Sequence, residues 1–177
     1  MTTAEYLATP ETVVPQELAY GVLRVADSPL APHQFAVGRL FIALFSHLEG
    51  RQSGEVWLSP IDVILDAERA LVVQPDLLVL SEARRSIVQD RVRGAPDLMI
   101  EVLSPNPRVG TIAERLRWFA RYGVRECWLV HLIDRRVEVI QFRAGEVVSH
   151  DMLGPDDVIR SSVVEGFDRT LASIIGW

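Results

Sequence analysis

The chain contains no lysine, and all 18 of its basic residues are arginines. Any mechanism that needs a catalytic lysine is therefore excluded. With 24 acidic residues the net charge is −6, which disfavours a sequence-independent nucleic-acid coat, because such proteins neutralise many phosphates with surplus positive charge. The arginines cluster at 84–85, 91–93, 115–125 and 135–136. Charge runs usually form solvated surface, so we expect that here, with a phosphate-binding surface as the alternative.

Cysteine and long apolar runs are scarce as well. Cys127 is the only cysteine, which excludes a disulfide within the chain and leaves a cysteine-based zinc site without support. No apolar run reaches membrane-spanning length, and the N-terminal residues lack the basic start and apolar stretch of a secretory signal. A cytoplasmic location is the default expectation. Sequence patterns for hydrolytic triads, phosphate-cradling loops and dinucleotide binding are also missing.

What is present predicts one globular domain over residues 1–177, since 49% of the residues are apolar and the chain is long enough for a core. Apolar spacing predicts a helix over 33–49 that Gly50 ends, and a capping-box spacing of Thr111 and Glu114 begins a second helix that runs to Tyr122. A short helix is expected at 168–175, an extended lead-in at 1–16, a loop with a short helix at 81–93, and a loop at 104–110. A turn followed by one strand is expected at 17–26, and further strands are expected at 55–58, 62–65, 71–80, 97–103, 126–131, 136–142 and 147–152. This mixture predicts an α/β (α+β) fold with a mixed central sheet flanked by helices.

Two acids stand where plain core strands would not carry them. Asp76 opens the apolar run 77–80, and Glu101 lies inside the run 98–103. Burying an ionised carboxylate without a partner is costly, so each acid needs a reason to be there. Taken alone, Glu101 is best explained as a buried ion-pair partner and Asp76 as turn chemistry. Together, two carboxylates on neighbouring strands suit Mg²⁺ or Mn²⁺, which are hard cations that prefer oxygen ligands.

The histidines carry weaker signals. His33 starts the first helix, where a neutral imidazole could accept from free backbone N–H groups, so a structural role is expected. His131 ends the strand at 126–131 and could face the same end of the sheet as the two acids. Strand alternation places Glu101 on one face with Met99 and Leu103, and the residues between them on the other.

The runs PDLLVL, GAPDLMIEVLSP and RLRWFARYGVRECWLV, in this order, resemble the Uma2 family, which is similar to restriction endonucleases of the PD-(D/E)XK type. The segments PQELAYGVLR and HQFAVGRL fit the family too, so that the resemblance covers about residues 15–142. It implies a restriction endonuclease-like core in which Asp76 is the aspartate of the PD pair and Glu101 is the second acid. The lysine that family members often carry on the following helix corresponds to Arg115. Two other family acids correspond to Val22 and His131.

The resemblance implies a Mg²⁺- or Mn²⁺-dependent endonuclease that hydrolyses phosphodiester bonds. Its expected partner is nucleic acid, and DNA is expected before RNA. In that interpretation Asp76 and Glu101 hold the metal, and Arg115 binds a phosphate. The alternative is a catalytically degenerate nuclease fold that binds nucleic acid or a protein partner without cleavage, because arginine does not readily lose a proton. A homo-oligomer and the identity of the nucleic acid are left open.

Overall fold

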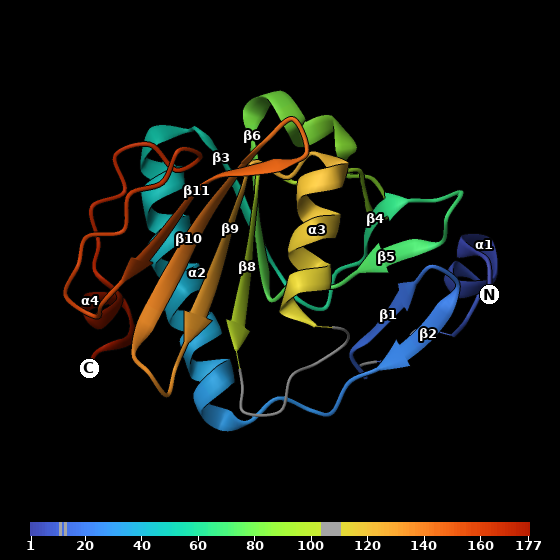
Figure 1. Ribbon diagram of the computed structural model, residues 1–177, viewed down its shortest axis with the longest axis horizontal. Coiled ribbons are helices and arrows are strands. Elements are labelled where there is room, and N and C mark those ends of the chain that lie inside the picture. Colours follow the sequence, from blue (N-terminus) through green and yellow to red (C-terminus); the bar gives the residue numbers. More distant parts are fainter. Residues whose placement is uncertain (11, 13, 104–110) are drawn as a thin grey trace.

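The computed structural model describes residues 1–10, 12, 14–103 and 111–177. Its strands form two sheets, one of six strands in the order β11-β10-β9-β8-β6-β3 and one of five in the order β2-β1-β5-β4-β7 (Figure 1). The six-stranded sheet contains β3 (Gly54–Leu58), β6 (Leu77–Ser81), β8 (Leu98–Leu103), β9 (Glu126–His131), β10 (Arg136–Arg143) and β11 (Glu146–Leu153). The smaller sheet contains β1 (Gln16–Ala19), β2 (Val22–Val25), β4 (Val63–Asp66), β5 (Leu71–Val73) and β7 (Val92–Arg93).

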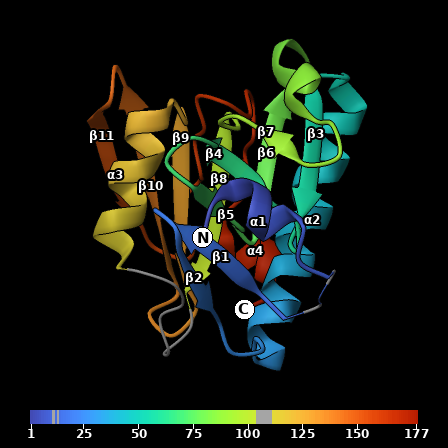
Figure 2. The same cartoon turned by 90° about the vertical axis from the view of Figure 1, so that its right-hand side faces the viewer.

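The helices of the described residues are α1 (Thr3–Leu7), α2 (Ala31–Arg51), α3 (Ile112–Tyr122), α4 (Leu171–Ile175) and a 3₁₀ segment, η1 (Glu82–Ile87). Helices α2 and α4 cover one face of the large sheet, and α3 covers the opposite face (Figures 1 and 2). Only β8 and β9 pair in parallel within this sheet, and its other pairs are antiparallel. The predicted α+β class with a mixed sheet flanked by helices is therefore confirmed. None of the helices in these ranges has the length and apolar character of a transmembrane span.

One expected strand is in fact two. The run 71–80 was expected to stay in one sheet, but β5 lies in the small sheet and β6 in the large one. The break falls at Pro75. Because proline has no backbone N–H to donate to a neighbouring strand, it commonly stands where a strand ends. The consequence for function is that Asp76 stands at the junction of the two sheets.

The alternation predicted for residues 97–103 is confirmed. Leu98, Ile100 and Val102 belong to the apolar cluster under α2 and α4, whereas Met99 and Leu103 pack in the cluster under α3. Because strand side chains alternate between the faces, Glu101 must lie on the α3 side. The position of this acid is thus set by the apolar residues on either side of it.

Helix α3 forms as the sequence predicts. The Thr111 side chain accepts from the Glu114 backbone N–H, and the Glu114 carboxylate accepts in return from the Thr111 N–H. Gly123 ends the helix in the left-handed conformation, with φ of 93°, which glycine adopts without the steric penalty of a side chain. The helix packs through Phe119 and Ala120 as expected, and through Trp118 as well.

The N-terminal region differs from the expectation. Residues 1–16 were expected to be extended, but Thr2 and Glu5 form a capping box that begins α1. Residues 17–26 were expected to be a turn and one strand, but they belong to the hairpin β1–β2. Its turn residues Tyr20 and Gly21 both have positive φ, the geometry that matches the twist of paired strands.

Helix α2 is confirmed and runs further than expected at both ends. It continues through Gly50 to Arg51, and Gln52 caps it in the left-handed conformation. Its apolar residues do not all face the core: Leu40 and Leu44 are fully buried, whereas Phe35 and Phe45 are exposed. The other expected elements form with boundaries shifted by a few residues, except that residues 104–110 lie outside the described ranges.

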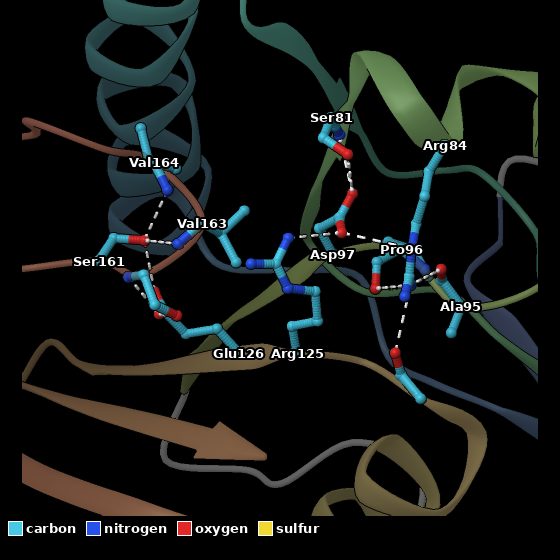
Figure 3. A network of polar contacts seen from close by, with 12 residues as sticks. Ser81, Arg84, Ala95, Pro96, Asp97, Arg125, Glu126, Ser161, Val163 and Val164 are labelled. Atoms are coloured by element: carbon cyan, nitrogen blue, oxygen red, sulfur yellow. Dashed lines mark hydrogen bonds and ion pairs between the residues drawn. The ribbon is translucent and has the colours of Figure 1, made fainter. Parts of the chain in front are cut away.

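A buried carboxylate fastens the C-terminal segment to the large sheet. Glu126 is fully buried, and it accepts hydrogen bonds from the Trp128 indole N–H (2.7 Å) and the Ser161 hydroxyl (2.6 Å). Its second oxygen accepts from the backbone N–H (2.8 Å) and the hydroxyl (2.7 Å) of Ser162. Figure 3 shows that the Ser161 hydroxyl oxygen in turn accepts hydrogen bonds from the backbone N–H groups of Val163 and Val164.

We expect Glu126→Gln to lower the free energy of unfolding by about 2 kcal/mol. The glutamine amide has one accepting oxygen in place of two, so some of the buried donors around it would lose their partner. Urea unfolding at neutral pH measures this change. Glu165→Gln is the matched control, since Glu165 is exposed on the same segment. Equal unfolding free energies for the wild type and Glu126→Gln would contradict the importance of this anchor.

Candidate functional site

The ladder between β6 and β8 places the two predicted acids opposite one another. Leu77 pairs with Ile100 in antiparallel register, so continuing the ladder by one residue brings Asp76 opposite Glu101. Directly opposed residues on neighbouring strands have side chains on the same face of a sheet. The register therefore places both carboxylates on the same face of the strand pair, and both are buried, with Asp76 4% and Glu101 9% exposed.

Asp76 is held by two other elements. One of its oxygens, Oδ2, accepts the backbone N–H of Val102 at 2.8 Å. The same oxygen lies 3.1 Å from Nε2 of His33, a buried residue in the first turn of α2. The expectation that the His33 ring accepts from free backbone N–H groups is wrong, because its Nδ1 atom is buried and has no hydrogen-bond partner among the residues that the structure describes. The ring is used instead to fix the aspartate.

Arg115 connects the acids to the small sheet. Its guanidinium binds Glu101 Oε1 through both Nε (3.1 Å) and Nη2. Through Nη1 it also donates to both oxygens of Glu17 in β1, at 2.9 and 2.6 Å. The ring of Phe119, one turn along α3, lies 5.5 Å from the guanidinium carbon, close enough for a cation–π contact. Arg115 thus lies directly beside Glu101.

Glu17 is the site residue that the sequence interpretation missed. It is 5% exposed and accepts the backbone N–H of Gln74 at 2.7 Å as well as the bonds from Arg115. The expected family acid was sought at Val22, but that side chain lies on β2 and is 59% exposed. The available signal was an acid next to the apolar pair Leu18-Ala19, which both face the interior. The sequence of this short strand, β1, does not indicate which residue Glu17 would contact.

Among the described residues, the carboxylates of Glu17, Asp76 and Glu101 share this site with the Arg115 guanidinium. Burial, and the charges of Asp76 and Glu17, raise the pKa of Glu101 to about 7, despite the opposing effect of Arg115. Burial alone would lower the pKa of Arg115, but the charges of Glu101 and Glu17 outweigh it, and the pKa is raised. The arginine is therefore always charged.

His131 and Cys127 do not join the acids. His131 Nε2 lies 2.6 Å from Glu138 Oε1, and the other oxygen of Glu138 lies 2.6 Å from His150 Nε2. Burial opposes ionisation of Glu138, but the hydrogen bonds from the two histidines prevail and lower its pKa. Burial raises the pKa of the Cys127 thiol well above its ordinary value, which leaves it protonated and unreactive.

Oxygen atoms dominate the ligand chemistry available at the site. Among the residues that the structure describes, no three histidine, cysteine, aspartate or glutamate side chains are arranged as a complete metal cage. A magnesium ion needs no such cage, because it commonly binds one or two carboxylates and completes its shell with waters and phosphate oxygens. Asp76 and Glu101 match that smaller requirement.

The fold is of the α+β class, with the buried acids Asp76 and Glu101 on its large sheet. The family model "Uma2: Putative restriction endonuclease" matches residues 3–172. The chain belongs to the Uma2 family, and the resemblance drawn from its sequence is confirmed. None of the curated proteins compared with the chain matches it significantly.

A solved structure supports the same fold. The chain is similar to a crystal structure described as a putative nuclease belonging to DUF820 from Anabaena variabilis, with a TM-score of 0.83. The alignment covers 100% of this chain and 98% of the other, at 17% sequence identity. At this identity, the similarity establishes the fold and leaves the chemistry to be argued from the site.

The raised pKa of Glu101 predicts a pH-dependent stability. Between its ordinary value of 4.5 and about 7, the folded protein keeps a proton that the unfolded chain releases. The free energy of unfolding should therefore fall as the pH rises through this window, by on the order of 2 kcal/mol. Urea unfolding at about pH 5 and about pH 8 measures the decline.

In Glu101→Gln, which cannot ionise at this position, most of the decline should vanish. Glu68→Gln changes an exposed carboxyl and should retain it. A decline of the same size in Glu101→Gln and in the wild type would show that another group titrates.

Proposed function

We propose that this chain is a metal-dependent nuclease that hydrolyses phosphodiester bonds in nucleic acid, with DNA as the first substrate class to test. The observation that carries the proposal is the pair of buried carboxylates, Asp76 and Glu101, opposed on neighbouring strands of a fold shared with the Uma2 family. The family description and the nuclease named for the Anabaena structure support the same class of reaction.

The donor set fits Mg²⁺ or Mn²⁺. Both residues offer carboxylate oxygens, which are the ligands that these hard cations prefer. When bound, the cation would acidify a water molecule and neutralise charge that develops on the phosphate. Asp76 and Glu101 would hold it, and His33 would keep the Asp76 side chain in place through its contact with Oδ2.

Arg115 would bind the scissile phosphate. A guanidinium can donate to two oxygens at once, which suits a phosphate as well as it suits a carboxylate. In place of its contacts with Glu101, the guanidinium would donate to phosphate oxygens, while Glu17 would continue to orient it through Nη1. The guanidinium cannot act as a general base, so the water must be activated without it.

A second candidate function rests on the same arginine. Arg115 already pairs with Glu101 and Glu17, and this arrangement is self-sufficient as a buried ion network. A protein of this kind would keep the nuclease fold and bind nucleic acid or a protein partner without cleavage. Cleavage by the purified chain is therefore the property that separates the two functions.

If the chain is a nuclease, we expect slow cleavage that is faster with Mn²⁺ than with Mg²⁺. Mn²⁺ acidifies its bound water more strongly and tolerates looser geometry, which offsets the missing lysine. Asp76→Asn and Glu101→Gln should each reduce cleavage by about 100-fold or more, whereas Arg115→Lys should retain or increase it. The assay compares single- and double-stranded DNA and RNA in each metal.

Asp168→Asn serves as the control, because Asp168 is exposed and lies outside the site. Cleavage that persists in Asp76→Asn and Glu101→Gln would indicate a contaminating nuclease or another site. Absence of cleavage in every form, Arg115→Lys included, would favour the binding function.

Metal binding provides a test that does not depend on turnover. Calorimetric titration of the wild type with Mn²⁺ should show one site per chain. In Asp76→Asn and Glu101→Gln the affinity should fall by at least about 10-fold, because one of two carboxylate ligands is lost. Binding of equal strength in all three proteins would rule out these residues as the metal site.

A further inference from the structure

A pocket lies at the opposite end of the large sheet from Asp76 and Glu101. It has a volume of about 670 Å³ and is bounded by the C-terminal end of α3, the residues entering β9, and the β10–β11 hairpin. Arg125 stands four residues before Leu129, which pairs with Glu101. At the rise of an extended strand, this separates the pocket from the acids by about 13 Å.

Arginines give this pocket its character. Arg121, Arg125 and Arg143 all line it, and no aspartate or glutamate does. The guanidinium carbon of Arg121 lies 5.9 Å from the centre of the Tyr122 ring, in a cation–π contact. Within the described ranges, neither Arg121 nor Arg143 forms an ion pair, and both are exposed. Two charges are thus available to a ligand.

The third arginine is only partly neutralised. Arg125 donates to Asp97 Oδ1 at 3.2 Å, but the same buried oxygen lies 3.3 Å from Nε of Arg84 (Figure 3). One carboxylate therefore serves two guanidinium groups. The Arg125 side chain remains 48% exposed beside the pocket. The excess positive charge stands out in a chain whose net charge is −6.

Neighbouring acids and carbonyls do not cancel this charge. Glu126 is buried, and its two oxygens are occupied by the four donors described above. Glu146 pairs with Arg143 in the strand register but does not line the pocket. At the end of α3, where exposed carbonyls would repel an anion, Gly123 N–H and Val124 N–H are bonded to carbonyls of the last turn, and Arg84 donates to Gly123 O.

We propose that this pocket binds a phosphate group carried by a nucleotide unit. Arginine is the side chain best suited to phosphate, because its planar fork donates two parallel bonds. The Gln141 amide adds a neutral polar group, and the volume falls within the range of sites for small organic ligands. The phosphate belongs either to a free mononucleotide or to a nucleic-acid strand, and the site is independent of the proposed acid chemistry.

The test is isothermal titration of the full chain, in low-salt buffer, with three probes: inorganic phosphate, adenosine monophosphate and a short single-stranded oligodeoxynucleotide. We expect Arg121→Gln and Arg143→Gln each to weaken binding of the tightest probe by about 10-fold, because each removes a charge-assisted contact. Arg143→Lys keeps the charge and should retain most of the affinity. Arg160→Gln is the matched control, since Arg160 is exposed and outside the lining.

Binding of the mononucleotide or of phosphate that depends on Arg121 and Arg143 identifies a small ligand. Binding of the oligonucleotide alone, with the same dependence, identifies a nucleic-acid strand. The proposal is overturned if no probe binds, or if Arg160→Gln weakens binding as much as the pocket variants do, which would indicate non-specific attraction. None of these variants touches the acid pair, so either result leaves the nuclease proposal to its own assays.

Discussion

The structure depends on one buried guanidinium that two sheets share. Arg115 donates to Glu17 on β1 in the small sheet and to Glu101 on β8 in the large one. Removing one partner from a buried ion network leaves an uncompensated charge, which is strongly destabilising. Lysine would keep the positive charge, but its compact ammonium lacks the planar fork with which the guanidinium donates to both carboxylates. The arginine thus ties the hairpin β1–β2 to the central strands.

This constraint bears directly on function. The same guanidinium that holds the sheets together is the group that would meet a phosphate, so binding and stability draw on one set of contacts. Asp76 is supported differently, by a backbone N–H on β8 and by a histidine on α2. Its carboxylate is therefore positioned without Arg115. A site built in this way keeps one acid fixed while the environment of the other depends on what the arginine binds.

The opposite end of the large sheet is rich in arginines. There, Asp97 is shared by two arginines, and the oxygens of Glu126 are occupied by hydroxyl, indole and backbone N–H donors. Arg121 and Arg143 are thus left without an acidic partner among the described residues. The acid-rich and arginine-rich ends are joined by the same strands, β8 and β9. A nucleic-acid substrate or a nucleotide would encounter both kinds of surface on one molecule.

The sequence by itself determined the two long helices, most of the large sheet, the face on which Glu101 lies, and the family. These follow from local patterns: the capping box at Thr111, the period of apolar residues in α2, and the alternation in β8. It also identified Asp76, Glu101 and Arg115, because acids inside apolar runs and the order of the family segments are visible in one dimension. Only the tertiary structure decided that Glu17 and His33 approach these residues, and that residues 71–80 divide between two sheets. Glu17 lies 98 positions from Arg115 in the chain, and no local pattern encodes which strand will pack against which helix. That choice is made when apolar faces are buried together, which brings distant charges into contact.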